Sequence, residues 1–185
     1  GSRKSEINIL MPILLNFVKL MNSKYNHINY VFHSTMEHYQ LIQSFIKSEN
    51  LSNCEIVSDD KIKSHILQKS IFAVAKSGTV SLEICNAKIP SIIIYKMGFI
   101  NFLIVKSLVT TKFANIINFA ANEEIIPELL QSDCNSKNIF KYVNNFLDNP
   151  NKIDEQIEKT QLILNKLKTK KSSSELASLS LNKFL

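Results

Sequence analysis

Hydrophobic and polar positions along this chain form two kinds of pattern in alternation, one typical of helices and one typical of buried strands. Apolar residues recur every three or four positions at its start, which predicts a helix over residues 5–22. Short apolar runs and further helical patterns then follow one another. The pattern predicts strands at 28–33, 54–58, 71–75, 91–95 and 113–117, and helices at 36–48, 59–69, 80–87, 123–131, 136–147 and 151–171. This alternation is typical of a parallel sheet with helices on both faces, so we expect an α/β, Rossmann-like fold.

The polar segment Ser77-Gly78-Thr79 lies between the predicted strand 71–75 and the predicted helix 80–87. A strand that turns into a helix in this way aims the first backbone N–H groups of the helix beyond the sheet edge, where they can hold a phosphate. Glu83 follows early in that helix and could accept hydrogen bonds from a sugar hydroxyl. The alternative is a plain turn and helix cap followed by an exposed carboxylate.

Arg3 is the single arginine among 22 basic residues. Its retention in a chain that otherwise uses lysine indicates a need for the planar guanidinium group, which can donate two parallel hydrogen bonds to a phosphate. The predicted helix 5–22 follows directly, so we expect a second phosphate-type turn here, with its central strand upstream of this chain. The chain would then be a fragment or one half of a larger protein. The alternative is a chance arginine beside an artificial Gly1-Ser2 start.

Length and composition indicate a soluble globular protein with one domain or one domain and a small appendage. Of its 185 residues, 45% are hydrophobic and 21% are charged. The net charge of +6 is spread along the chain, and basic and aromatic residues do not interleave on one element. We therefore expect no nucleic-acid partner. We also expect no metal and a cytoplasmic location with reduced thiols, because the three cysteines are far apart and no histidine pairs with them at metal-binding spacing.

Residues 97–105 form an apolar run without charges, flanked by Lys96 and Lys106. The run is too short to span a membrane, which takes roughly 20 residues. It would be either a core helix or a helix lying at a lipid surface, with Phe99, Phe102 and Leu103 toward the lipid and the lysines toward the head groups.

Five motifs, taken in order, resemble the carboxy-terminal half of the lipid-A-disaccharide synthases, a family of inverting GT-B glycosyltransferases. They are Gly1-Ser2-Arg3-x-x-Glu6-Ile7, Ser77-Gly78-Thr79-x-x-Leu82-Glu83, Pro90 with Tyr95-Lys96-Met97, Asn118, and Ile126-Pro127-Glu128-Leu129-Leu130-Gln131. The resemblance extends to about residue 150. It implies that residues 1–150 are a Rossmann-like UDP-sugar-binding domain lacking its first strand, and that residues 151–185 are a helical extension.

The resemblance implies transfer of 2,3-diacylglucosamine from UDP to 2,3-diacylglucosamine 1-phosphate, which gives the lipid A disaccharide 1-phosphate of lipopolysaccharide. It implies no cofactor, a peripheral place at the inner face of the bacterial inner membrane, and an amino-terminal domain absent from this chain. The resemblance leaves open whether the enzyme forms a homodimer. The chain alone is expected to be inactive.

The resemblance also assigns roles to individual residues. Arg3 and Asn118 would be catalytic, and Asn118 would lie near the reaction centre. The UDP site would comprise Ser2 and Arg3 at the diphosphate, Ser77, Gly78 and Thr79 at a phosphate or the ribose, Glu83 at the ribose hydroxyls, and Tyr95 and Met97 beside the uracil.

Three positions depart from the family pattern. Ile117 replaces a proline, Asn122 replaces a glycine, and Glu123 replaces a basic residue. Asparagine can keep the positive φ angle of a glycine, whereas Glu123 reverses a charge near the expected diphosphate pocket. Two alternatives stay open: an inactive split-gene remnant, and another GT-B enzyme or epimerase using UDP-N-acetylglucosamine. The latter enzymes tend to carry a second glycine-rich turn, which this chain lacks.

Overall fold

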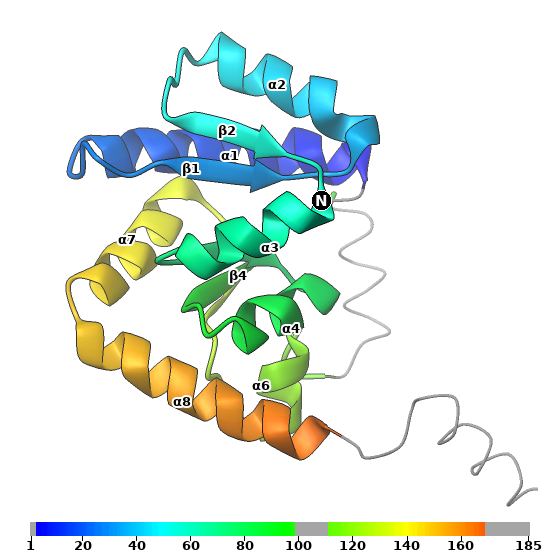
Figure 1. The fold of residues 1–185 in the computed structure, drawn as a ribbon, viewed down its shortest axis with the longest axis vertical. Coiled ribbons are helices and arrows are strands. Elements are labelled where there is room, and N and C mark those ends of the chain that lie inside the picture. Colours follow the sequence, from blue (N-terminus) through cyan, green and yellow to red (C-terminus); the bar gives the residue numbers. More distant parts are fainter. Residues whose placement is uncertain (1–2, 99–110, 169–185) are drawn as a thin grey trace, which may run out of the picture.

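Figure 1 shows a computed structural model of the chain, which describes residues 3–98 and 111–168. Its strands are β1 (Tyr30–His33), β2 (Cys54–Val57), β3 (Ala73–Lys76), β4 (Ser91–Tyr95) and β5 (Glu128–Leu130). Its helices are α1 (Lys4–Asn22), the 3-10 turn η1 (Met36–His38), α2 (Tyr39–Ser48), α3 (Asp60–Lys69), α4 (Thr79–Asn86), α6 (Ile116–Ala121), α7 (Ser136–Leu147) and α8 (Pro150–Leu167).

All strand pairs in this part of the chain are parallel. β1 pairs with β2, and β4 lies between β3 and β5 in a second sheet. Each parallel connection needs a crossover, and helices supply it, as in β3–α4–β4. The expected α/β class with parallel strands flanked by helices is confirmed.

The second sheet is buried on both faces, and β4 shows why. Ile92, Ile93 and Ile94 are almost completely buried. Ile92 and Ile94 pack with residues of α1 and α7, whereas Ile93 packs with residues of α4, α6 and α8. Because successive side chains of a strand point to opposite faces, an unbroken apolar strand requires helices on both sides.

Two helices connect this core to the rest of the molecule. A neighbouring face of α1 packs against α2 in a third apolar cluster that includes Leu15 and Ile46. α8 runs along the end of the molecule away from β1 and β2 (Figure 1), and its Ile163 and Leu164 belong to the cluster around Ile93. α8 thus contributes to the same core, and the expected division of the chain at residue 150 stays a prediction.

The predictions between residues 113 and 131 are wrong. The segment predicted as a strand contains the start of α6, because the Asn115 side chain accepts a hydrogen bond from the Ile117 N–H (2.8 Å) and caps the helix. The segment predicted as a helix contains β5. Pro127 would break a helix there, and instead its carbonyl accepts the Ile93 N–H (2.9 Å) as β5 begins.

Three helices end in a left-handed residue that is not glycine. Asn50, Lys88 and Asn122 follow α2, α4 and α6 with φ angles of 53°, 58° and 52°. The expectation that Asn122 keeps a positive φ angle is confirmed. After α4, the Ile89 N–H reaches back to the Ile84 carbonyl (3.2 Å), a bond that requires the left-handed turn between them. A further left-handed residue, Gln131 (φ 51°), follows β5.

The thiols of Cys85 and Cys54 should react slowly with iodoacetamide in the native chain. Burial raises the pKa of each to about 11. Only the thiolate reacts, so at pH 8 alkylation should be roughly a hundredfold slower than in urea and should accelerate only as the pH approaches 11. Mass spectrometry of quenched samples measures this, and equal rates in native and unfolded protein would contradict the packing around α4 and β2.

Candidate nucleotide-binding site

Two segments far apart in sequence meet at the carboxyl end of β3. Glu6 lies in the first turn of α1, and Lys76 is the last residue of β3. The Lys76 ammonium lies 2.6 Å from the Glu6 carboxylate, and the Arg3 guanidinium lies 3.6 Å from the same oxygen. The structure thus brings Arg3 to the sheet edge at which the turn of Ser77 begins.

The turn after β3 requires a glycine for its backbone conformation. Gly78 has φ 154° and ψ −168°, a region that is essentially restricted to glycine. A Cβ atom built there would meet no atom within 4 Å, so space is not the reason. The Gly78 carbonyl accepts the Ser81 hydroxyl (2.7 Å) and thereby fixes the first turn of α4.

Within the described residues, no side chain caps the amino end of α1 or α4, as is also true of α2 and α8. By contrast, α3, α6 and α7 are capped by Asp59, Asn115 and Asn135. The first backbone N–H groups of α1 and α4 can therefore donate to an anion, which the positive end of a helix dipole also favours.

Ser77 is linked to Asn118 through Glu128. The Ser77 hydroxyl donates to the Ala114 carbonyl. The backbone N–H groups of Ala114 and Asn115 donate to the Glu128 carboxylate at 2.7 and 3.0 Å. The Asn118 amide donates to the same carboxylate at 2.8 Å. The turn after β3, the segment entering α6 and the first residue of β5 therefore form one hydrogen-bonded unit.

Asn118 lies inside this unit and not at its surface. The residue is 0% exposed. Its amide also donates to the Ile126 carbonyl (2.7 Å), and its oxygen accepts the N–H groups of Ile125 and Ile126 (2.9 Å each). Both donors and both acceptor positions are therefore in use. These contacts make Asn118 a structural link between α6 and the segment entering β5. A direct catalytic contact stays a prediction, and it would require the side chain to leave these bonds.

Tyr95 lies next to the Arg3–Glu6–Lys76 cluster. It ends β4, and the Lys76 ammonium lies 5.1 Å from the centre of its ring. Gln131 is bonded to the backbone of the same segment. Its N–H donates to the Tyr95 carbonyl (2.8 Å), and its side chain accepts the Met97 N–H (3.4 Å). Gln131 therefore positions the segment expected to border the uracil, beside the residues expected at the diphosphate.

The remaining predicted site residues either lie on α4 or fall outside the described residues. The Glu83 side chain is 47% exposed and forms an ion pair with Lys63 of α3 at 2.5 Å. Thr79 is exposed at the first position of α4. Ser2, Phe99, Phe102 and Leu103 lie outside the described residues, so their expected roles stay predictions.

The charge reversal at Glu123 is only partly offset, because Glu123 shares its lysine partner with Glu155. Glu123 lies 2.9 Å from the Lys159 ammonium of α8, and this contact raises the pKa of Lys159. Ile117, which stands at the family's proline position, is completely buried against the second sheet.

Sequence reasoning missed Lys76 and the link through Glu128. Glu6 was visible only as a motif residue three positions after Arg3, and Glu128 only as part of the last motif. One signal in the sequence could have identified Lys76. It is a lysine at the end of an apolar strand, directly before a serine–glycine turn. Its partner is 70 positions away, which no local pattern reveals.

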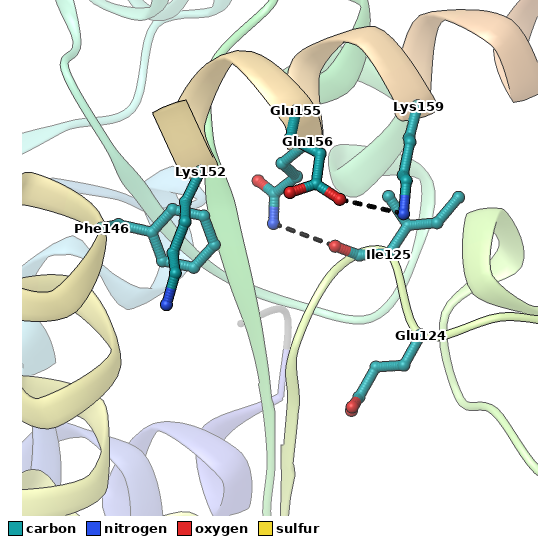
Figure 2. A pocket seen from close by; sticks show the side chains of 7 residues that line it. All are labelled: Glu124, Ile125, Phe146, Lys152, Glu155, Gln156 and Lys159. Atoms are coloured by element: carbon teal, nitrogen blue, oxygen red, sulfur yellow. Dashed lines mark hydrogen bonds and ion pairs between the residues drawn. The ribbon is translucent and has the colours of Figure 1, made fainter. Parts of the chain in front are cut away.

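A pocket of about 170 Å³ lies elsewhere, between α8 and the segment before β5 (Figure 2). Gln156 bonds both the N–H and the carbonyl of Ser91, the first residue of β4, so the pocket lies at the amino end of the sheet. Gln156 also donates to the Ile125 carbonyl, and Lys159 pairs with Glu155 (Figure 2). Since these polar groups are used by the chain itself, the pocket is a structural junction.

No helix within residues 3–98 and 111–168 has the length and apolarity that crossing a membrane requires.

Comparison with known proteins gives one consistent family. The lipid-A-disaccharide synthetase family matches residues 1–181. The lipid-A-disaccharide synthase of Rickettsia typhi is 31% identical over 169 residues, which are 91% of this chain and 44% of the relative. That of Sulfurihydrogenibium sp. is 28% identical over 186 residues, 96% of this chain and 48% of the relative. The chain thus spans less than half the length of these relatives.

A solved structure from Listeria monocytogenes, described as a provisionally assigned UDP-N-acetylglucosamine 2-epimerase, shares the fold with a TM-score of 0.59. It covers 84% of this chain and 36% of its own chain at 14% identity, so it supports the architecture alone. The family match extends over nearly all of the sequence and includes the turns that meet at the carboxyl edge of β3. The chain therefore belongs to the lipid-A-disaccharide synthase family.

Proposed function

We propose that this chain is the UDP-sugar-binding part of an enzyme that transfers 2,3-diacylglucosamine from UDP to 2,3-diacylglucosamine 1-phosphate. The observation that carries the proposal is the meeting of Arg3, the Ser77-Gly78 turn and Tyr95 at one edge of the sheet, in a member of this family. A guanidinium, two uncapped helix amino ends and an aromatic ring are the groups that a uridine diphosphate would use.

The proposed chemistry follows from where charge develops. When the glycosidic bond to UDP breaks, negative charge grows on the diphosphate, and preorganised donors that face it lower the barrier. Arg3, 74% exposed at its side chain, and the first N–H groups of α1 and α4 would serve as these donors. Tyr95 and Met97 would border the uracil. Glu83 would accept from the ribose only after exchanging its ion pair with Lys63.

We propose that residues 1–150 form this domain, that residues 151–185 are a helical extension whose α8 packs on its core, and that a strand from outside the chain completes the sheet. Within the described residues, β1 pairs with β2 and β3 pairs with β4, so β1 and β3 each have one edge without a strand partner. A strand between them would join the two sheets into one. It would also precede α1, as the right-handed crossover of parallel strands requires.

A peripheral location at the inner face of the inner membrane belongs to the same proposal. Both proposed substrates carry acyl chains, so the enzyme would work where lipid is present. The apolar residues Phe99, Phe102 and Leu103 between Lys96 and Lys106 have the composition of a segment that rests on a lipid surface. The acceptor and the catalytic base would then be held by another part of the enzyme.

Replacing Arg3 by lysine should weaken UDP binding by about 1–3 kcal/mol, because lysine keeps the charge and loses the bidentate fork. Calorimetric titration of the chain with UDP measures this. Uridine, which lacks phosphate, should bind both proteins equally. Equal UDP affinities would remove Arg3 from the site, and absence of UDP binding by the unaltered chain would contradict the proposed function.

A further inference from the structure

We propose that Lys76 is a second cationic ligand of the donor diphosphate, and that Glu6 and Tyr95 hold it in place for this role. The inference rests on the proposed function. Lys76 ends β3 and directly precedes Ser77, so its backbone lies where the phosphate-type turn begins. Its ammonium lies 2.6 Å from Glu6 and 5.1 Å from the centre of the Tyr95 ring. It thus lies between residues proposed for the diphosphate and a residue proposed for the uracil.

The charges of the cluster favour an anionic ligand. Arg3 and Lys76 approach the same oxygen of Glu6, so two cations share one carboxylate and the cluster keeps a net positive charge. The other Glu6 oxygen is buried and has no hydrogen-bond partner within the described residues. Glu6 therefore holds Lys76 at close range but cannot neutralise both cations, and a diphosphate could supply the remaining negative charge.

The geometry leaves donors for a ligand. A lysine ammonium has three N–H donors. Glu6 takes one of those of Lys76, and the Tyr95 ring covers one side without accepting a strong hydrogen bond. The Lys76 side chain remains 26% exposed. Its remaining donors can therefore reach a group outside the fold, while the two contacts restrict the motion that a lysine on an open surface would have.

The competing interpretation is that Lys76 and Glu6 form a purely structural ion pair. The two interpretations differ in whether loss of Lys76 weakens only the binding of a ligand that carries phosphate. If Lys76 contacts the diphosphate, Lys76→Met should weaken binding of UDP by about tenfold or more, since hydrogen bonds to charged groups have this strength. Binding of uridine, measured by NMR titration, should not change. Lys76→Arg should restore most of the UDP affinity. Lys141→Met removes the same charge from an exposed position of α7 and should leave both affinities unchanged.

Among the described residues, removing Lys76 leaves the buried Glu6 carboxylate with Arg3 as its one remaining partner, which could unfold the chain. The same comparison is therefore made in a Glu6→Gln background, which leaves no buried carboxylate behind and keeps an amide oxygen that can accept a hydrogen bond from Lys76. There, Lys76→Met should again weaken UDP binding and leave uridine binding unchanged.

Two results would overturn the inference. The first is equal UDP affinity with and without Lys76 in the Glu6→Gln background, while the unaltered chain binds UDP; this would leave the proposed function intact. The second is a parallel loss of UDP and uridine binding, which would mean that Lys76 acts only through the fold. If the unaltered chain binds no UDP, the inference fails together with the proposed function.

Discussion

Replacing Asn118 by leucine should lower the free energy of unfolding by roughly 3–5 kcal/mol, since each buried polar group left unsatisfied costs about 1–3 kcal/mol. Leucine has a similar size but leaves the N–H and the carbonyl of Ile126 without their partner, and it leaves the Ile125 N–H with only the Glu123 carbonyl (3.1 Å). It also removes one of the donors that hold Glu128. Urea denaturation followed by circular dichroism measures the change.

The control is Asn165→Leu, the same substitution at an exposed position of α8, which should change stability by less than about 0.5 kcal/mol. A leucine variant as stable as the parent chain would show that Asn118 is not the structural link described above. If such a variant also lost UDP binding, the direct contact predicted from the sequence would be the better interpretation.

Replacing Gln156 by leucine should lower the free energy of unfolding by roughly 2–4 kcal/mol, for the same reason at the opposite end of the sheet. The residue is 4% exposed and bonds the Ser91 N–H (2.7 Å), the Ser91 carbonyl (3.1 Å) and the Ile125 carbonyl (3.2 Å). It thus attaches α8 to the start of β4 and to the segment before β5. The exposed Gln68 of α3 provides the matched control, Gln68→Leu.

Ligand binding gives this experiment a second readout. The pocket lined by Gln156 lies at the amino end of the sheet, whereas the proposed UDP site lies at the carboxyl end. UDP affinity of the folded Gln156→Leu protein should therefore equal that of the parent. Unchanged stability together with weaker UDP binding would reverse the assignment of the two ends.

The core of the fold could be predicted because its signals are local. The run Ser91-Ile92-Ile93-Ile94-Tyr95 is apolar throughout, and burial on both faces follows from that alone. Prediction failed at residues 113–131, where single side chains decide the outcome. The Asn115 cap begins a helix in a segment rich in β-branched residues, and Pro127 marks the entry to a strand. Both signals were in the sequence, but the apolar pattern outweighed them.

For the candidate site, only the features that depend on neighbouring residues in the sequence could be predicted. Gly78 in a serine–glycine turn after an apolar strand indicated the backbone that the structure has. The contact of Lys76 with Glu6 joins residues 70 positions apart and depends on how α1 lies across the sheet. The burial of Asn118 likewise depends on α6 packing over β5, the region in which the elements were predicted wrongly.

Lys88 and Gln131 have a backbone conformation that costs an ordinary L-residue roughly 1–2 kcal/mol. Asparagine, which occupies the corresponding places after α2 and α6, tolerates that conformation better. A chain with only three glycines thus carries unrelieved conformational strain at two of its turns. Its margin of thermal tolerance is accordingly narrower than its well-packed interior alone would suggest. Lys88 is the position where that margin could be widened without touching the core or the proposed ligand site, because the Gln131 side chain also holds the segment at Met97.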